Sequence, residues 1–269
     1  MDKLIALGTG NANATHCYNT CFILKGPGGL ILCDAGGGNG IMRQLQKIGI
    51  AWEQIHHLII THAHTDHLMG VVWTIRMIST RMNNGTYQGT LDIYCDHDVG
   101  EGLKAMCRLM LQKKMHQHLD QDILFHDVAN GMQAVLAGRS ITFFDILSTK
   151  MKQFGFCAQL EGSRKLCCLG DEPYNPGCQR YVQGADWVLC EAFCLYGDRE
   201  RFKPYEKHHS TVKEACQLAE SLHVPHLVVW HTEDTTPIET RKQRYTQEGA
   251  AFYHGDLHVP DDLETIDLI

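Results

Sequence analysis

The segment THAHTDHLMG, residues 61–70, carries three histidines and one aspartate within six consecutive positions. These side chains come directly after the apolar run 58–60, and they are His62, His64, Asp66 and His67. Neutral imidazoles and carboxylates bind zinc, and they also suit manganese or iron. A single histidine at such a place is usually a satisfied polar residue of a turn, but four candidate ligands so close together predict a metal site.

The elements that must position this segment can be followed along the chain. Short apolar runs bounded by Gly, Asp or Asn predict strands at 4–7, 30–33, 58–60, 91–94, 141–144, 166–169, 187–189 and 227–230. Helical patterns predict helices at 41–48, 67–80, 99–113, 212–222 and 238–247. Thr211, followed by Glu214, has the capping-box pattern of a helix start. This mixture of strands and helices predicts a layered α/β fold with helices outside and sheet inside.

Length and charge limit the class of protein. A chain of 269 residues fits one domain, 1–269, that buries its core without disulfide or metal support. The formal net charge is −7, so no basic field exists to collect polyanions at long range. We therefore do not expect a dedicated nucleic-acid-binding protein.

The cysteines and the first residues indicate the compartment. The twelve cysteines lie largely inside apolar runs, as do Cys33, Cys95, Cys167, Cys168 and Cys190. We expect them to be reduced, mostly buried thiols and not a disulfide framework. The first residues lack a signal-peptide pattern, and no apolar run approaches the roughly 18 residues of a membrane span. The prediction is a soluble, cytoplasmic protein.

The motif HxHxDH behind an apolar strand resembles that of the metallo-β-lactamase fold superfamily. Two earlier segments are similar to its ribonuclease Z-like branch: LGTG at 7–10 resembles the opening motif, and DAG at 34–36 resembles the D-x-G turn. The resemblance implies an α/β (α+β layered) fold, the αββα sandwich, with a two-metal site at one edge.

Later motifs extend the resemblance over most of the chain. The GD pair ending at Asp171 is similar to the strand end whose aspartate bridges the metals, and the WH pair ending at His231 is similar to the last ligand. The HST motif starting at His209 resembles that of the same branch, with Glu191 resembling the acidic residue before it. Loops at one edge of a layered sheet converge, which agrees with ligands so far apart in sequence.

The resemblance also implies roles. His62 and His64 would bind one metal, Asp66, His67 and His231 the other, and Asp171 would bridge them. Two cations about 3.5–4 Å apart can hold a hydroxide and take up charge from both attacking and leaving oxygens. The catalytic residues would be Asp66, His209 as proton donor to the leaving oxygen, and Glu191 as its orienting partner. The implied cofactor is zinc, as one or two ions, with manganese or iron left open.

One family ligand is missing. The family places a further histidine a few residues before an aromatic-Gly-aromatic strand, but no histidine lies between Asp127 and Phe156. The hydroxyls of Ser148 and Thr149 are poor zinc ligands, although Lys150 could approach the place of a cation. The first metal site is therefore expected to be weaker, to hold a water there, or to be empty. Three histidines that the pattern does not place could serve as substitutes, namely His16, His116 and His118.

Two ambiguities concern the second half of the chain. His208 could face the site instead of His209. The segment 194–209 looks like a long loop that could roof the pocket, with cations to hold an anionic substrate at Arg199, Arg201, Lys203 and Lys207. Because acidic residues interleave with these cations, a solvated charged loop is an equal alternative.

The expected reaction is hydrolysis of a small or nucleotide-like phosphodiester, because the HST motif belongs to the nuclease and cyclic-phosphodiesterase side of the superfamily. Hydrolysis of a carboxylic ester, lactone or thioester is the first alternative, and a non-hydrolytic metal-binding protein with a degenerate first site is the second. We do not expect tRNA binding, since the Gly-rich, basic arm of ribonuclease Z has no counterpart in the sequence. The expected partner is a small anionic or ester substrate, without a membrane, and the resemblance is compatible with a homodimer.

Overall fold

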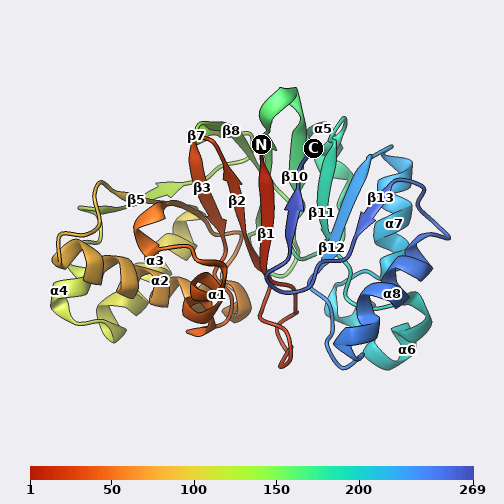
Figure 1. The fold of residues 1–269 in the computed structure, drawn as a ribbon, viewed down its shortest axis with the longest axis horizontal. Coiled ribbons are helices and arrows are strands. Elements are labelled where there is room, and N and C mark those ends of the chain that lie inside the picture. Colours follow the sequence, from red (N-terminus) through yellow and green to blue (C-terminus); the bar gives the residue numbers. More distant parts are fainter.

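The computed structural model describes residues 1–269 and contains two facing seven-stranded sheets (Figure 1). The first sheet has the order β14-β1-β2-β3-β4-β5-β6, with β1 (Lys3–Gly8), β2 (Cys21–Gly26), β3 (Gly29–Cys33), β4 (Ile55–Ile59), β5 (Leu91–Cys95), β6 (Ile123–Asp127) and β14 (Thr265–Asp267). The second has the order β13-β12-β11-β10-β9-β8-β7, with β7 (Gln133–Leu136), β8 (Arg139–Asp145), β9 (Phe154–Gln159), β10 (Lys165–Cys168), β11 (Trp187–Glu191), β12 (His226–Trp230) and β13 (Asp256–His258).

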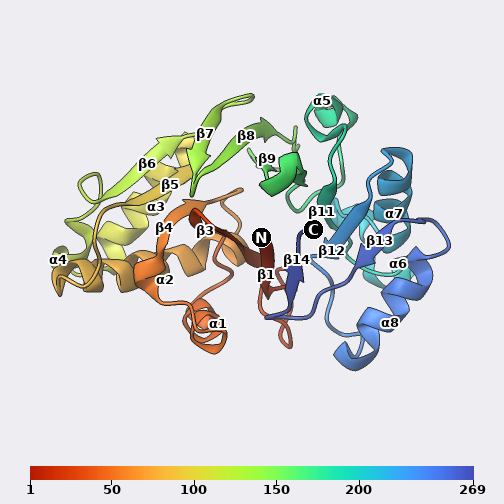
Figure 2. The same cartoon turned by 45° about the horizontal axis from the view of Figure 1, so that its top comes forward.

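Helices cover the outer side of each sheet, which gives the expected αββα sandwich (Figure 2). The first sheet carries α1 (Gly40–Ile48), α2 (Thr65–Asn83), α3 (His97–Met110) and the short α4 (Lys113–His116). The second half carries α5 (Gln179–Val182), α6 (Arg199–Phe202), α7 (Val212–Ser221) and α8 (Ile238–Gly249). No helix is long and apolar enough to span a bilayer.

The alternation of side chains along each strand builds three apolar layers. In β3, Leu30 and Leu32 pack with α1, α2 and α3, whereas Ile31 and Cys33 pack between the sheets. In β12, Val228 and Trp230 face that central layer, and Leu227 and Val229 pack under the helices of the second half. Strands buried on both faces are continuous apolar runs, which is why the sequence pattern made them visible.

The parallel part of each sheet positions the site. β3 to β6 run parallel in the first sheet, and β10 to β13 run parallel in the second. The carboxyl ends of parallel strands meet at one edge of a sheet, where loops can gather functional side chains. In this fold the loops after β3, β4, β10 and β12 do so.

All eight strands and five helices expected from the sequence are present, with shifted ends. The helix expected at 99–113 ends at Met110, because Leu111 and Gln112 are extended and α4 starts anew. Strands β2, β6, β7 and β13 were not expected. The C-terminal residues form β14, an edge strand against β1.

Two cysteines correct the expectation of reduced thiols. Cys157 in β9 and Cys167 in β10 lie directly opposite each other in an antiparallel pair, and they are joined in a disulfide with Cα atoms 4.1 Å apart. The prediction of reduced thiols was wrong for Cys157 and Cys167, because strand register, which decides the facing pair, is not visible in the sequence. The other ten cysteines are free and buried, as expected.

The start of α2 presses against the turn after β3. The amide of Gly70 donates a hydrogen bond to the carbonyl oxygen of Gly36 at 2.7 Å, and a Cβ at Gly70 would lie 1.8 Å from the carbonyl oxygen of Ala35. Only glycine allows this approach, so Gly70 sets how deeply the ligand-bearing end of α2 enters the site.

We expect Gly70→Ala to lower the free energy of unfolding by about 1–3 kcal/mol, because the added methyl group forces the helix away from the turn. The matched control is Gly102→Ala in α3, where a Cβ meets nothing within 4 Å, and which should stabilise by about 0.4–1 kcal/mol. Urea denaturation gives both values. Equal stability of the two variants would contradict the proposed close packing.

Candidate metal centre

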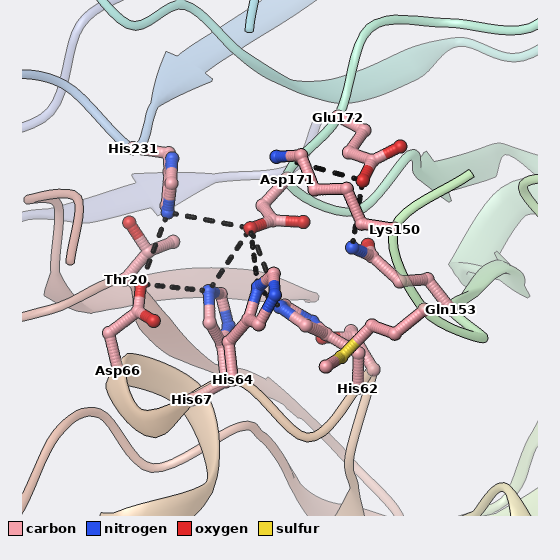
Figure 3. A network of polar contacts seen from close by, with 12 residues as sticks. Thr20, His62, His64, Asp66, His67, Lys150, Gln153, Asp171, Glu172 and His231 are labelled. Carbon is pink, nitrogen blue, oxygen red and sulfur yellow. Dashed lines mark hydrogen bonds and ion pairs between the residues drawn. The ribbon is translucent and has the colours of Figure 1, made fainter. Parts of the chain in front are cut away.

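The six expected ligands converge at the sandwich edge where the parallel strands end (Figure 3). Residues 62–67 lead from β4 into α2, Asp171 follows β10, and His231 follows β12. They form two groups, His62 with His64 and Asp171, and Asp66 with His67 and His231. Within each group, one ligand atom of every member lies within 4.8 Å of the others. The structure thus brings together every ligand that the sequence singled out.

The first group lies where the chain is still extended. The Nε2 atom of His62 is 3.4 Å from the Oδ2 atom of Asp171, and the Nδ1 atom of His64 is 3.9 Å from the same oxygen. His62 is fully buried, whereas His64 is about one-third exposed. The group is therefore open to solvent on the His64 side.

The second group is closed. The Oδ2 atom of Asp66 lies 3.3 Å from Nε2 of His67 and 3.3 Å from Nε2 of His231, and all three side chains are buried. His231 has a positive φ of 58°, a strained backbone region for such a residue. Holding it there costs about 1–3 kcal/mol, which fits a residue kept for function and not for stability.

Asp171 lies between the two groups. Its Oδ2 atom is also 3.7 Å from Nε2 of His67 and 3.7 Å from Nε2 of His231. Its other oxygen, Oδ1, and Nε2 of His67 are buried without a hydrogen-bond partner. Such unpaired buried atoms are costly, and divalent cations bound by nitrogen and oxygen would satisfy them. The residues present therefore fit one or two such cations.

Asp34 supports the second group and was not recognised as a site residue from the sequence. The Nδ1 atom of His67 lies 2.8 Å from Oδ2 of Asp34, and Thr61 donates to both oxygens of Asp34 from its amide and hydroxyl. A carboxylate on the outer nitrogen of a histidine fixes the ring and leaves the inner nitrogen for a metal. The signal was the D-x-G turn, but its partner cannot be read from spacing.

The electrostatics favour a cation. Burial would raise the pKa of Asp171, yet the imidazoles of His62, His64 and His231 hold that pKa well below its usual value. Burial opposes ionisation of Asp66 too, but the adjacent imidazoles of His231 and His67 lower its pKa. Burial also opposes protonation of His67, although Asp34 and Asp66 raise its pKa well above the usual value. Both carboxylates are thus ionised at neutral pH, and metal binding would displace the His67 proton.

His209, and not His208, faces the metal centre. His209 is 8% exposed and lines one cavity of about 330 Å³ together with His64, Asp66, Asp171 and His231. The ring of His209 stacks on Phe193, with centroids 5.0 Å apart, and its Nδ1 atom is 3.6 Å from Oε2 of Glu191. Glu191 is fully buried and accepts a hydrogen bond from the amide of Ser210. The expected pair is therefore held in place at the cavity wall.

Lys150 lies in the segment before β9, where the resemblance implies a further histidine and the sequence has none. It lines the same cavity as His64 and Asp171, and its Nζ atom is 3.7 Å from Oε1 of Glu172 (Figure 3). Ser148 and Gln153 donate hydrogen bonds to the same Glu172 oxygen. A cation thus stands beside the first group in place of a third imidazole. Glu172, which organises this corner, was not foreseen.

The substitute ligands considered from the sequence are not in the centre. His16 is exposed and lies 3.6 Å from Asp234, and His118 binds Asp122 and Asn83 near α4, where His116 also lies. The segment 194–209 is not an irregular loop, because it contains α6 and two single helical turns. None of its four cations lines the metal cavity.

Known proteins share this architecture over its whole length. Curated relatives called ribonuclease Z are 26% identical to this chain in Bradyrhizobium sp., over 89% of this chain and 92% of the relative, and 24% identical in Thermococcus sibiricus, over 100% and 97%. Among solved structures, the metallo-β-lactamase fold protein YhfI from Bacillus subtilis has a TM-score of 0.78 at 15% identity, covering 98% of each chain. Human tRNase Z, short form, has a TM-score of 0.73 at 20% identity, covering 99% of each.

The profile of the family described as "Anti-Pycsar protein Apyc1" matches residues 2–249, nearly the whole chain. Together with the ribonuclease Z relatives, this match confirms the superfamily and branch that the motifs indicated, and it favours an enzyme over a binding protein without activity. The chain belongs to the Anti-Pycsar protein Apyc1 family, in the ribonuclease Z-like branch of the metallo-β-lactamase superfamily.

Proposed function

We propose that the protein is a metal-dependent phosphodiesterase that hydrolyses a small, nucleotide-like phosphodiester. The observation that carries this proposal is the His209–Glu191 pair on the wall of the cavity that both ligand groups share. When bound, zinc supplies the Lewis acidity that makes water a nucleophile at neutral pH. The two ligand groups, His62 with His64 and Asp171, and Asp66 with His67 and His231, would hold it.

His209 would serve as the proton donor to the leaving oxygen. When water attacks the phosphorus of an alkyl phosphodiester, the P–O bond to one alcohol breaks and that alcohol leaves as a basic alkoxide, so protonation of its oxygen lowers the barrier. Glu191 and Phe193 fix the ring of His209 from its far side, and the cavity lies on its near side. Carboxylic esters need this help less than phosphodiesters of poor leaving groups do.

Lys150 would bind an oxygen of the phosphoryl group. It enters the cavity beside His64 and Asp171, where the first ligand group has only three protein ligands. A fixed ammonium there compensates for a first metal that is bound weakly, because it stabilises charge that develops on the phosphoryl oxygens. Glu172 keeps the ammonium of Lys150 at this corner. The distance of 3.7 Å between Nζ and Oε1 is longer than that of a hydrogen-bonded ion pair, so the ammonium would still be able to attract a phosphoryl oxygen.

Three features favour a small substrate. The cavity of about 330 Å³ adjoins a second one of about 360 Å³ through His209, and this pair of volumes suits a nucleotide-sized ligand. The alignment with the Thermococcus ribonuclease Z extends over 315 residues, although this chain has only 269, so the relative carries insertions that this chain lacks. The net charge of −7 also disfavours a polyanionic substrate.

Hydrolysis of carboxylic esters or lactones is the second candidate. The lining of the adjoining cavity includes Ile146, Leu147, Tyr174 and Tyr205, and such a surface accepts an acyl chain as well as a base. Hydrolysis rates measured on one set of substrates distinguish the two candidates. The set contains two kinds of phosphodiester, bis(p-nitrophenyl) phosphate and 3′,5′-cyclic nucleotides of each base, and two carboxylic substrates, p-nitrophenyl butyrate and a lactone.

Zinc content tests the ligand groups. Relative to the wild type, we expect His62→Ala to lose one weakly held zinc per chain and Asp66→Ala to lose a tightly held zinc together with all turnover. The reason is that the second group is closed, whereas the first is open and lacks an imidazole. Equilibrium dialysis with elemental analysis gives the occupancies, with exposed His97→Ala as control. Equal affinity at both groups would refute this ranking.

Loss of the proton donor should depend on the leaving group. His209→Ala is expected to lower kcat by about 10²–10⁴-fold for a nucleotide substrate, but much less for bis(p-nitrophenyl) phosphate, whose leaving group needs no proton. Glu191→Gln should show the same pattern in milder form, and His208→Ala should leave kcat unchanged. Steady-state kinetics with zinc content verified would check this. An equal loss on both substrates would assign His209 a structural role.

The corner at Lys150 can be tested with two substitutions. Lys150→Met should lower kcat/KM by about 10²-fold, because a fixed positive charge is lost from the phosphoryl site. Lys150→His should instead raise zinc affinity at the first group, since it supplies the missing imidazole. Titration with a chromophoric zinc chelator measures this affinity. If Lys150→Met were fully active, the phosphoryl-binding role of Lys150 would be wrong.

A further inference from the structure

A third cluster of metal-binding side chains lies at the far end of β12 from the metal centre. His226 is the first residue of β12, and Asp256 and His258 are the first and last residues of the neighbouring edge strand β13. The register pairs His226 with Asp256, and alternate residues of a strand share a face. His231 follows the other end of β12, so at about 3.3 Å per residue the two places are roughly 16 Å apart.

The spacing of this cluster is that of a metal site. Three groups of His, Cys, Asp or Glu side chains in this chain have ligand atoms within 4.8 Å of one another. This cluster is one of them, and the other two form the metal centre. The Nδ1 atom of His226 is 3.4 Å, and the Nε2 atom of His258 is 3.8 Å, from the Oδ2 atom of Asp256. Four hydrogen-bonded imidazole–carboxylate pairs elsewhere on the surface measure 2.6 to 3.1 Å. Ligands of one tetrahedral zinc, at about 2.0–2.2 Å from the ion, are roughly 3.3–3.5 Å apart.

Both inward nitrogens lack another partner. Nδ1 of His226 and Nε2 of His258 are buried and accept or donate no hydrogen bond. The side chain of Asp256 is 69% exposed, so a cation can enter from solvent and complete its coordination with water. Two imidazoles and one carboxylate with an open position form a donor set that suits zinc.

The cluster has a rigid support. The ring of His226 stacks on buried Trp187 in β11, with centroids 4.1 Å apart and planes 10° apart, and His258 lies 5.2 Å from the same ring. This packing holds the two imidazoles in place before any metal binds. Pre-positioned ligands lose less conformational freedom on binding, which raises affinity.

We propose that His226, Asp256 and His258 form a zinc site, separate from the metal centre, that fastens the edge strand β13 to β12. The strand β13 has three residues and pairs with β12 at only three positions. A zinc bound across the two strands adds a link where the backbone ladder is short. Binding to the folded state alone would also raise the stability of the protein.

The test measures zinc alone on the full chain. Equilibrium dialysis at micromolar free zinc compares the wild type with Asp256→Ala and His258→Ala, and the midpoint of urea unfolding is recorded with and without zinc. The exposed side chain of Asp256 makes no packing contribution that folding would require. The matched control is His254→Ala. His254 is an exposed histidine two residues before Asp256, and it hydrogen-bonds Glu220.

Each variant of the cluster is expected to hold one zinc fewer per chain than the wild type, to bind zinc at this site at least tenfold more weakly, and to show a smaller zinc-dependent shift of the unfolding midpoint. Turnover should be unchanged in both, and His254→Ala should match the wild type. Equal zinc content in Asp256→Ala and the wild type would overturn the proposal. It would equally be overturned if Asp66→Ala combined with His62→Ala removed all bound zinc.

Discussion

The carboxylate of Asp171 is the constraint on which the rest of the site depends. One of its oxygens lies 3.4 to 3.9 Å from imidazole nitrogens of four histidines, while the other is buried without a partner. Such an arrangement is stable only when positive charge lies between these groups, either as protons or as cations. The fold places the carboxylate there by ending β10 at the same edge as β4 and β12. The positive φ of His231 and the close contact of Gly70 with the turn after β3 also help to bring the ligands together. The first turns the His231 side chain toward Asp171, and the second lets the ligand-bearing start of α2 approach the site.

The two halves of the chain each supply an incomplete site. The first sheet contributes the histidine-rich segment and Asp34, whereas the second contributes Asp171, His231 and the His209–Glu191 pair. Their relative position therefore determines the chemistry. At the opposite edge, Asp2 before β1 accepts from Arg139 of β8 and from the amide of Glu161 after β9, and the Asp2–Arg139 pair is buried. A buried pair of this kind contributes little net stability, but its hydrogen bonds join the first sheet to the second at this end of the sandwich.

The sequence predicted what is local and missed what is not. The segment from His62 to His67 is visible as a metal motif because all four candidate ligands lie within six consecutive residues. Buried strands are visible because they are unbroken apolar runs, whereas β6 and β7 mix polar and apolar residues and were not foreseen. Asp171 and His231 needed the family resemblance, since GD and WH are common pairs. The contacts of Asp34 and Glu172, and the bond between Cys157 and Cys167, depend on strand register and loop course, which no local pattern encodes.

The absence of one histidine gives a reason for the charged side chains of Lys150 and Glu172 beside the first ligand group. A metal held by three neutral imidazoles and a carboxylate needs no further cation, but here one imidazole is missing and Lys150 lines the same cavity. A free ammonium beside Asp171 would compete with the metal for that carboxylate. Glu172 would oppose this competition, because its Oε1 atom lies 3.7 Å from the ammonium and accepts hydrogen bonds from Ser148 and Gln153. On the proposed function, the first group would remain available for a metal while the ammonium of Lys150 supplied a positive charge for the phosphoryl group, which links the altered ligand set to the proposed phosphodiester chemistry.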